Sequence, residues 1–183
     1  MATTTYVLLM RGINVGGRKM PMAQLRTLME GLGHTDVRTY VQSGNAVFTT
    51  GSDEGSEALA RQLEDAIEGE FGYRTACLVL AGDYLRAVAD ACPFPAAELE
   101  GRQLHATFLS RQPEPERFAG IDAEALLPEE YRVGERVLYL YTPDGLGRSK
   151  LAEAVHRPAV LKGIDWTSRN WNTVTKLLDM AGA

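Results

Sequence analysis

The sequence predicts an α+β protein of two consecutive ferredoxin-like (α-β plait) βαββαβ units, the second less regular and followed by an added C-terminal helix. Two observations carry this prediction. In the first half, apolar runs and amphipathic segments alternate in the order β-α-β-β-α-β, which is the split βαβ pattern. The same order returns with weaker periodicity in the second half. With 183 residues, of which 45% are hydrophobic and 23% charged, the chain has the composition of a globular protein and room for two small cores.

The first half has short elements bounded by glycine or proline. Pro21 suits the first turn of a helix, and Gly31 and Gly33 mark its end. Apolar residues of this helix recur at the spacing that buries one helical face. The predicted elements are a strand at 6–11, a helix from 21 to 32, strands at 37–42 and 46–50 around a turn at 43–45, a helix at 59–71 and a strand at 74–81.

The second half repeats this order less clearly. Its predicted elements are a strand at 104–109, a weakly helical segment at 113–126, a hairpin of strands at 131–133 and 137–141, a helix from about 149, a short strand at 163–167 and a closing helix at 172–180. Prolines and a shift to acidic composition mark a connector between the halves. We therefore predict a first unit at 1–82, a connector with a short helix at 83–102, and a second unit with the C-terminal helix at 103–183.

A glycine-rich basic loop, residues 11–19, lies between the first strand and the first helix. Free backbone N–H groups and a helix N-terminus meet at such a loop and favour an anion. In the βαββαβ topology, this loop and the 42–45 hairpin turn leave the same edge of the sheet. The two polar turns are therefore predicted to converge. The candidate ligand-binding residues of this edge are Arg11, Gly12, Asn14, Gly16, Gly17, Lys19, Gln42, Ser43 and Asn45.

The same topological argument places residues 144–150 beside residues 167–173 in the second unit. This edge again combines a glycine-rich basic turn with a polar turn that leads into a helix. The candidate ligand-binding residues here are Arg148, Lys150, Arg169, Asn170, Trp171 and Asn172. Taken singly, these residues also have structural explanations: Asn170 suits a helix N-cap, and Trp171 suits packing of the last helix onto the sheet. Both interpretations stay open.

Positive charge is concentrated in two segments of an acidic chain, each of which contains one of these loop edges. The net charge is −5, yet residues 1–52 and residues 144–176 each carry a balance of +3, and the segment between them carries −10. Solvated surface explains most charged runs, so this distribution supports the anion sites only together with the loops.

Familiar catalytic motifs are not matched. Residues 12–19 come within one position of a phosphate loop, but Arg18 replaces its lysine and Lys19 replaces its magnesium-binding hydroxyl. The three histidines are isolated in sequence, which argues against a metal site. Ser43 is not in a nucleophile elbow, and no carboxylate pair flanks the loops. We name no catalytic residue and no cofactor, and whether the protein is an enzyme is left open.

Other partners are less favoured. A ferredoxin-like unit also forms the RNA-recognition motif, but that motif needs exposed aromatic residues on its central strands, where the first unit has only Tyr6 and Phe48. Tyr131, Tyr139 and Tyr141 of the second unit are a weaker alternative, for which a place in the core or an interface is favoured. No run approaches the ~20 apolar residues of a membrane span. The N-terminus has no signal-peptide pattern, and Cys77 and Cys92 suit buried reduced thiols, so we expect a cytoplasmic protein. The oligomeric state is not predicted.

Three motifs carry a resemblance to a known family. They are LMRGINVGG at 9–17, TYVQSGN at 39–45 and RNWNTV at 169–174. With these motifs in this order, the chain resembles the uncharacterised bacterial proteins of domain-of-unknown-function family 1697. The resemblance covers nearly the whole chain and implies two ferredoxin-like units. It implies no activity, cofactor or catalytic residue.

Three hypotheses for function follow. The leading one is a protein that binds a small anionic, phosphate-bearing ligand at its glycine-rich basic loops. The second is an enzyme, a transferase or hydrolase, that acts on such a ligand. The third is a nucleic-acid or protein-binding module that uses the two positive segments; it predicts a steep dependence of binding on salt.

Overall fold

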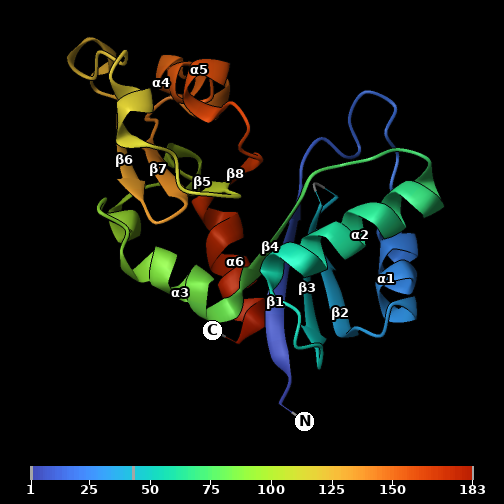
Figure 1. The fold of residues 1–183 in the computed structure, drawn as a ribbon. Coiled ribbons are helices and arrows are strands. Elements are labelled where there is room, and N and C mark those ends of the chain that lie inside the picture. Colours follow the sequence, from blue (N-terminus) through green and yellow to red (C-terminus); the bar gives the residue numbers. More distant parts are fainter. Residues whose placement is uncertain (1, 43, 183) are drawn as a thin grey trace. The chain divides into compact units, whose positions relative to one another are not determined.

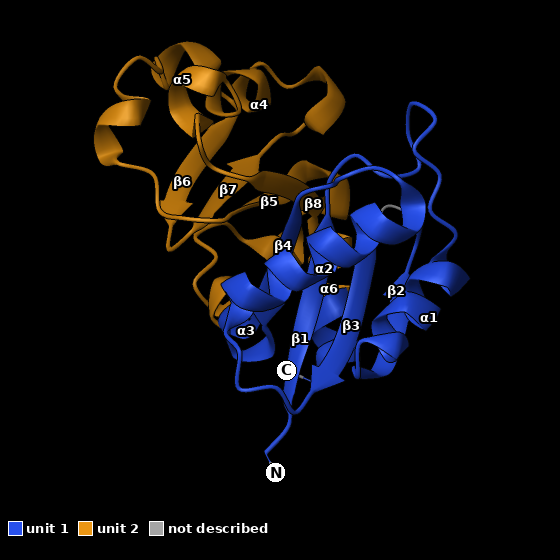
Figure 2. Ribbon diagram, turned by 45° about the vertical axis from the view of Figure 1, so that its right-hand side comes forward, with its two compact units in different colours: residues 1–86, 177–183 blue, residues 87–176 orange. Residues whose placement is uncertain are grey.

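The computed structural model describes residues 2–42 and 44–182. Ser43, one of the predicted site residues, lies outside them. The chain divides into two compact units, shown in blue and orange in Figure 2. The first consists of residues 1–86 and 177–183, and the second of residues 87–176. Each unit is described by itself below.

The first unit has the ferredoxin-like topology that the sequence predicts. Its elements are β1 (Thr4–Met10), α1 (Met22–Gly31), β2 (Thr35–Tyr40), β3 (Asn45–Thr50), α2 (Ser56–Phe71) and β4 (Cys77–Ala81). The strands form one sheet in the order β2-β3-β1-β4, and every neighbouring pair is antiparallel. Figure 1 shows the loop between β1 and α1, in blue, projecting beyond the end of the sheet.

The core of the first unit lies between this sheet and its two helices. Alternate residues of β1, such as Leu8 and Met10, face Leu25 of α1 and Leu63 of α2 in one buried cluster. Buried side chains that recur every two residues along the strands thus pack against buried side chains that recur about every 3.6 residues along the helices. The helix α2 ends at Gly72, which takes the left-handed conformation that a helix C-terminus favours. The buried ends of the strands hold the connecting loops at the edge of the sheet.

The second unit repeats the strand order with fewer regular helices. Its elements begin with α3 (Gly82–Asp90), which starts in the first unit. They continue with η1 (Ala96–Glu98), η2 (Gly101–Gln103), β5 (Leu104–Leu109), η3 (Pro115–Phe118), η4 (Glu124–Leu126), β6 (Glu130–Gly134), β7 (Val137–Tyr141), η5 (Leu146–Arg148), α4 (Lys150–Val155), α5 (Pro158–Leu161), β8 (Trp166–Asn170) and α6 (Trp171–Ala181). The sheet order is β6-β7-β5-β8, again antiparallel throughout. The predicted fold class, with its less regular second unit, is confirmed.

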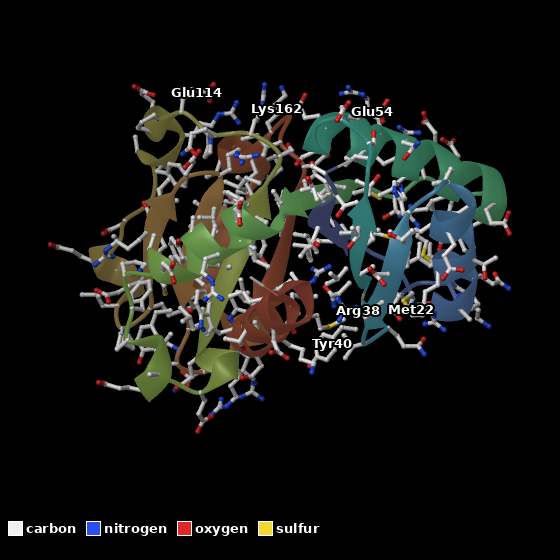
Figure 3. All side chains as sticks on the ribbon, turned by 90° about the horizontal axis from the view of Figure 1, so that it is seen from below. Met22, Arg38, Tyr40, Glu54, Glu114 and Lys162 are labelled. Atoms are coloured by element: carbon white, nitrogen blue, oxygen red, sulfur yellow. The ribbon has the colours of Figure 1, made fainter. Side chains whose placement is uncertain are left out.

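Two short 3₁₀ helices replace the first crossover helix of the second unit. The predicted helical segment at 113–126 contains Pro113, Pro115 and Gly120, which interrupt a continuous helix. Side chains stabilise the segment instead: Arg117 pairs with Glu114 and donates to the carbonyl oxygen of Lys162 at 2.8 Å. Glu114 and Lys162 are labelled at this end of the second unit in Figure 3.

The last strand lies further along the chain than predicted. The sequence placed it at 163–167 and left 167–173 as a polar turn, whereas β8 spans Trp166–Asn170 and leads directly into α6. The strand was not predicted at this position because its residues Ser168, Arg169 and Asn170 have low intrinsic strand preference. Pairing with β5 overrides this preference, with Ser168 opposite Thr107 and Arg169 opposite Ala106.

The two compact units divide α6 between them. Its residues from 177 onward group with the first unit, where Arg38 of β2 donates a hydrogen bond to the carbonyl oxygen of Met180. The predicted domain limits at 82 and 102, with the whole C-terminal helix in the second domain, stay a prediction. Within residues 2–42 and 44–182, none of the helices combines the length and hydrophobicity that crossing a bilayer requires.

Candidate functional site

The two polar turns of the first unit meet, as the topology predicts. The backbone N–H of Met10, at the end of β1, donates to the carbonyl oxygen of Gly44 at 2.8 Å. The side-chain amide of Asn14 donates to the carbonyl oxygen of Gln42 at 2.6 Å. The 11–19 loop and the turn before β3 therefore form one surface, which we call the first loop edge (residues 11–19, 41, 42, 44 and 45).

Asn14 organises the longer of these loops. Its Nδ2 donates to the carbonyl oxygens of Gln42 and Met20, and its Oδ1 accepts from the N–H of Met20 at 2.9 Å. Its φ is +54°, a left-handed conformation that asparagine adopts more readily than most residues. The amide of Asn14 thus fixes the loop against the neighbouring turn.

A tight turn forms the tip of the loop. The N–H of Arg18 donates to the carbonyl oxygen of Val15 at 3.1 Å, and Gly16 and Gly17 between them have φ values of +57° and +87°. Positive φ at both central positions is what a type I′ turn requires, and glycine meets this requirement without strain. The N–H groups of Val15, Gly16 and Gly17 have no hydrogen-bond partner within residues 2–42 and 44–182. Three successive free donors therefore lie at the exposed tip.

Gly44 permits the close approach of the two turns. A Cβ atom at this position would lie 2.9 Å from Cδ1 of Ile13 and 3.0 Å from Cβ of Met10. Its φ of +87° adds a second reason for glycine. The side chain of Ile13 is buried beneath the loop, so an apolar anchor and a glycine contact hold the loop edge together.

Basic side chains surround the turn. The guanidinium group of Arg18 lies 5.8 Å from the ring centre of Tyr73, and the Tyr73 hydroxyl donates to the carbonyl oxygen of Lys19 at 3.2 Å. Burial raises the pKa of the Tyr73 phenol, and the nearby Arg18 charge partly offsets this rise. In the described part of the chain, no carboxylate forms an ion pair with Arg18 or Lys19. Arg11 is exposed beside them.

Sequence reasoning found most of this edge but missed two contributors. It grouped Arg11, Gly12, Asn14, Gly16, Gly17 and Lys19 with Gln42 and Asn45, and the structure brings these residues together. Asn45 is fully buried and donates to the carbonyl oxygen of Tyr40, so it shapes the turn from inside. Arg18 belonged to the predicted basic loop but was not among its candidate ligand-binding residues. Tyr73 follows α2, and no local signal in the sequence links it to the loop.

The basic turn of the second unit is built differently. The strand ends β7 and β8 do lie at one edge, because Tyr141 pairs with Leu104 and Asn170 pairs with His105. The start of α4, however, is occupied by a carboxylate of the same chain. Glu129 accepts hydrogen bonds from the Ser149 hydroxyl and from the N–H of Leu151, the latter at 3.4 Å. Ser149 in turn caps the helix by accepting from the N–H of Ala152 at 2.9 Å.

Arg148 and Lys150 line a cavity to which none of residues 167–173 contributes. The cavity has a volume of 210 Å³, and its other wall is the segment 125–129. Asp144 and Glu129 also line it, so acidic and basic groups share the space. A second hollow, of 510 Å³, lies between α1 and α2 and is lined by Gln24, Thr27 and Glu70 among others. None of the predicted site residues lines that hollow.

The remaining predicted residues of the second unit have structural partners. Asn170 accepts from the N–H of Thr173 at 2.9 Å and so caps α6. Trp171 is buried, with its ring centre 6.5 Å from that of Tyr139. Arg169 is buried and donates to the Thr167 hydroxyl at 2.6 Å, and burial lowers the pKa of Arg169 to about 10. Asn172 is exposed and lies against Gly101.

One polar cluster was not predicted from the sequence. The Thr107 hydroxyl lies 2.8 Å from Nε2 of His156 and 2.6 Å from the Ser168 hydroxyl, and the imidazole of His156 stacks on Trp166 at 4.1 Å. These residues come from β5, β8 and the end of α4, so no sequence spacing brings them together. The cluster satisfies polar groups between the sheet and α4. Across the described residues, no three His, Cys, Asp or Glu side chains are placed to hold a metal ion.

The two antiparallel sheets, each with the order of a ferredoxin-like fold, define a protein of two α-β plait units. The chain belongs to the family described as "Protein of unknown function (DUF1697)", which matches residues 3–139 and confirms the predicted family. Its structure is similar to that of the conserved bacterial protein SP0830 from Streptococcus pneumoniae. That likeness has a TM-score of 0.68 at 23% identity over 98% of this chain and 99% of the other, and it supports the fold. No curated protein matches the chain.

Proposed function

We propose that the protein binds a small phosphate-bearing ligand at the first loop edge. The observation that carries the proposal is the set of three successive free N–H groups at Val15, Gly16 and Gly17, flanked by Arg18 and Lys19. Successive backbone donors in a turn form a concave anion site, and lysine and arginine supply the charge that a phosphate requires. Residues 1–29 contain no acidic residue, so the loop itself brings no competing carboxylate.

Binding is the function that these groups support. Among the described residues of the first loop edge there is no carboxylate, histidine or cysteine, so a transferase or hydrolase stays the alternative rather than the proposal. Both cysteines, Cys77 and Cys92, are free thiols, which is consistent with a reducing compartment. We therefore also propose a cytoplasmic location.

The test is a thermal-shift titration with inorganic phosphate on the parent and on two paired variants. The first pair is Arg18→Met with Lys19→Met, and the matched control is Arg148→Met with Lys150→Met in the second unit. At ten times its Kd, a ligand stabilises the native state by about 1.4 kcal/mol, which raises the Tm of a protein of this size by about 3–5 °C. The control is expected to keep this rise, and the first pair is expected to lose it. A rise that survives in the first pair would refute the proposed site.

A further inference from the structure

The first loop edge exposes two valine side chains beside its basic groups. Val15 is 61% exposed and Val41 is 52% exposed, and they are among the few large hydrophobic residues of the described chain that face solvent. The other two are Leu127 and Val133, both in the second unit. An isolated exposed valine needs no explanation, but two at one charged edge suggest a surface that meets an apolar group.

Hydrogen bonds place both valines close to the anion-binding groups. Val15 and Arg18 are the first and last residues of the same tight turn, so their Cα atoms lie within about 7 Å of each other. Val15 precedes the free donors of Gly16 and Gly17. Val41 lies next to Gln42, whose carbonyl oxygen accepts from Asn14 at 2.6 Å, and Asn14 adjoins Val15. Val15 and Val41 are thus each one residue away from the hydrogen bond that joins the two turns, and we treat them with Arg18 and Lys19 as one patch.

The backbone conformation of Val41 also supports an external contact. Its φ of +48° is an outlier for a β-branched residue, for which asparagine or glycine would be easier. The side chain is mostly exposed, so packing in the core does not compensate for this backbone strain. A contact made outside the chain would use the apolar surface that the valine presents.

We infer that the ligand is a phosphate monoester whose organic part is apolar and lies on Val15 and Val41, while its phosphate meets the turn donors, Arg18 and Lys19. This inference rests on the proposed function and narrows it to a ligand class. The positive charge of the patch selects the dianionic phosphate, and the valine side chains select an aromatic or aliphatic ester group over a polar one.

The experiment compares methyl phosphate with phenyl phosphate by calorimetric titration at pH 8. The two probes carry the same charge and differ in their apolar group alone. Phenyl phosphate is expected to bind at least fivefold more tightly than methyl phosphate. Equal affinities would overturn the inference and leave the proposed function intact. Binding of neither probe would overturn the proposed function itself.

Two variants localise the effect. Val15→Ser and Val41→Asn are each expected to reduce the ratio of the affinity for phenyl phosphate to the affinity for methyl phosphate at least threefold. Val41→Asn suits a positive φ, so its fold is expected to be retained, and an unchanged or higher Tm checks this. Val133→Thr in the second unit is the control and is expected to keep the preference. A preference unaltered by both loop variants would overturn the inference.

Phenol is a further control, which tests whether the apolar group binds without the charged phosphate group. It is expected to bind at least tenfold more weakly than phenyl phosphate, because it lacks the phosphate group. Sedimentation of the parent and of Val15→Ser tests the other occupant of such a patch, a second copy of the chain. A dimer that dissociates in the variant would show that the valines form a subunit interface, and this result would overturn the inference.

Discussion

The two units have the same strand order and each carries a glycine-rich basic turn, yet they treat the backbone donors of that turn in opposite ways. In the first unit, the N–H groups of Val15, Gly16 and Gly17 have no partner among the described residues. In the second, Gly145, Ser149 and Leu151 already donate within the unit, and Glu129 occupies the start of α4. A turn that contains glycine and basic residues is therefore an anion site only if its backbone N–H groups are free to bind an external anion.

Acidic residues make the same distinction. The first loop edge is held together by the neutral side chain of Asn14, which uses its amide to fix the turns. In the second unit, Asp144 and Glu129 share a cavity with Arg148 and Lys150. A carboxylate of the chain therefore competes with any external anion at the second edge, and the buried Arg169 is directed to its own strand.

The largest expected effect on the free energy of unfolding comes from a comparison of three glycines whose added Cβ atoms would meet different surroundings. Gly44→Ala introduces a left-handed alanine and a contact with Ile13, and it is expected to lower the free energy of unfolding by about 3–4 kcal/mol. Gly16→Ala, which meets no atom within 4 Å, isolates the conformational cost of about 1–2 kcal/mol. At Gly101 the three atoms nearest to an added Cβ all belong to the exposed Asn172 side chain, so rotation of that side chain is expected to keep the cost of Gly101→Ala below about 1 kcal/mol. Urea denaturation measures all three, and equal losses at 44 and 101 would contradict the difference.

Acid stability distinguishes the units through their buried histidines. Burial lowers the pKa of His105 in the second unit to about 4, and burial also lowers the pKa of His34 in the first. The unfolded chain binds these protons first, so stability is retained above the ordinary histidine pKa of about 6.5 and lost as the pH falls toward the folded value. For His105 the loss reaches about 3 kcal/mol near pH 4.

Replacement of each histidine by glutamine measures its share of this loss. His105→Gln is expected to flatten the dependence of unfolding free energy on pH between 6.5 and 4, and His34→Gln is expected to flatten it below the ordinary histidine pKa. Stability curves of the parent and of His105→Gln that run parallel across this range would show that His105 takes up its proton normally in the folded state.

Asn14 is expected to be the main determinant of order at the first edge. Asn14→Ala removes three hydrogen bonds and leaves alanine at a φ of +54°, so it is expected to lower the free energy of unfolding by about 2–3 kcal/mol. Asn14→Gly removes the same hydrogen bonds without the strain and is the matched control. An Asn14→Ala protein that unfolds at the parent's urea concentration would show that the loop does not depend on this amide.

The smallest expected effect concerns the carboxylate of the second unit. Glu129→Gln keeps the shape of the side chain but removes its charge from Ser149 and Leu151, and we expect a loss of about 1–2 kcal/mol. Urea denaturation of the parent and of the variant measures this loss. An unchanged free energy of unfolding would mean that the charge of Glu129 is not what stabilises the helix start.

The sequence was sufficient for the fold because both units follow local periodicities. The order of strands and helices in the first unit, including the end of α2 at Gly72, was predicted from apolar spacing and glycine. The position of β8 was not, because Ser168, Arg169 and Asn170 form a strand only through pairing with β5. Strand preference is set by neighbours across the sheet more than by the residues themselves.

The site was predictable to the extent that topology determines it. The contact between Asn14 and Gln42 joins residues 28 positions apart, and the βαββαβ order alone predicted that their turns meet. The contributions of Tyr73 and Glu129 were not predictable, since each reaches its turn from an element distant in sequence. The same is true of Thr107, His156 and Ser168, which three separate elements bring together.

The most direct test is a titration of isotope-labelled protein with inorganic phosphate, followed through backbone amide chemical shifts. A ligand held by the turn donors must move the amide signals of Val15, Gly16 and Gly17 first and furthest, with smaller changes at Arg18 and Lys19. Signals of residues 144–151 in the second unit are expected to stay in place, because Gly145, Ser149 and Leu151 already donate within the unit and Asp144 and Glu129 bring negative charge to the same cavity. Shifts that concentrate at 144–151, or that are absent from 15–17 at saturating phosphate, would contradict an anion site at the first loop edge.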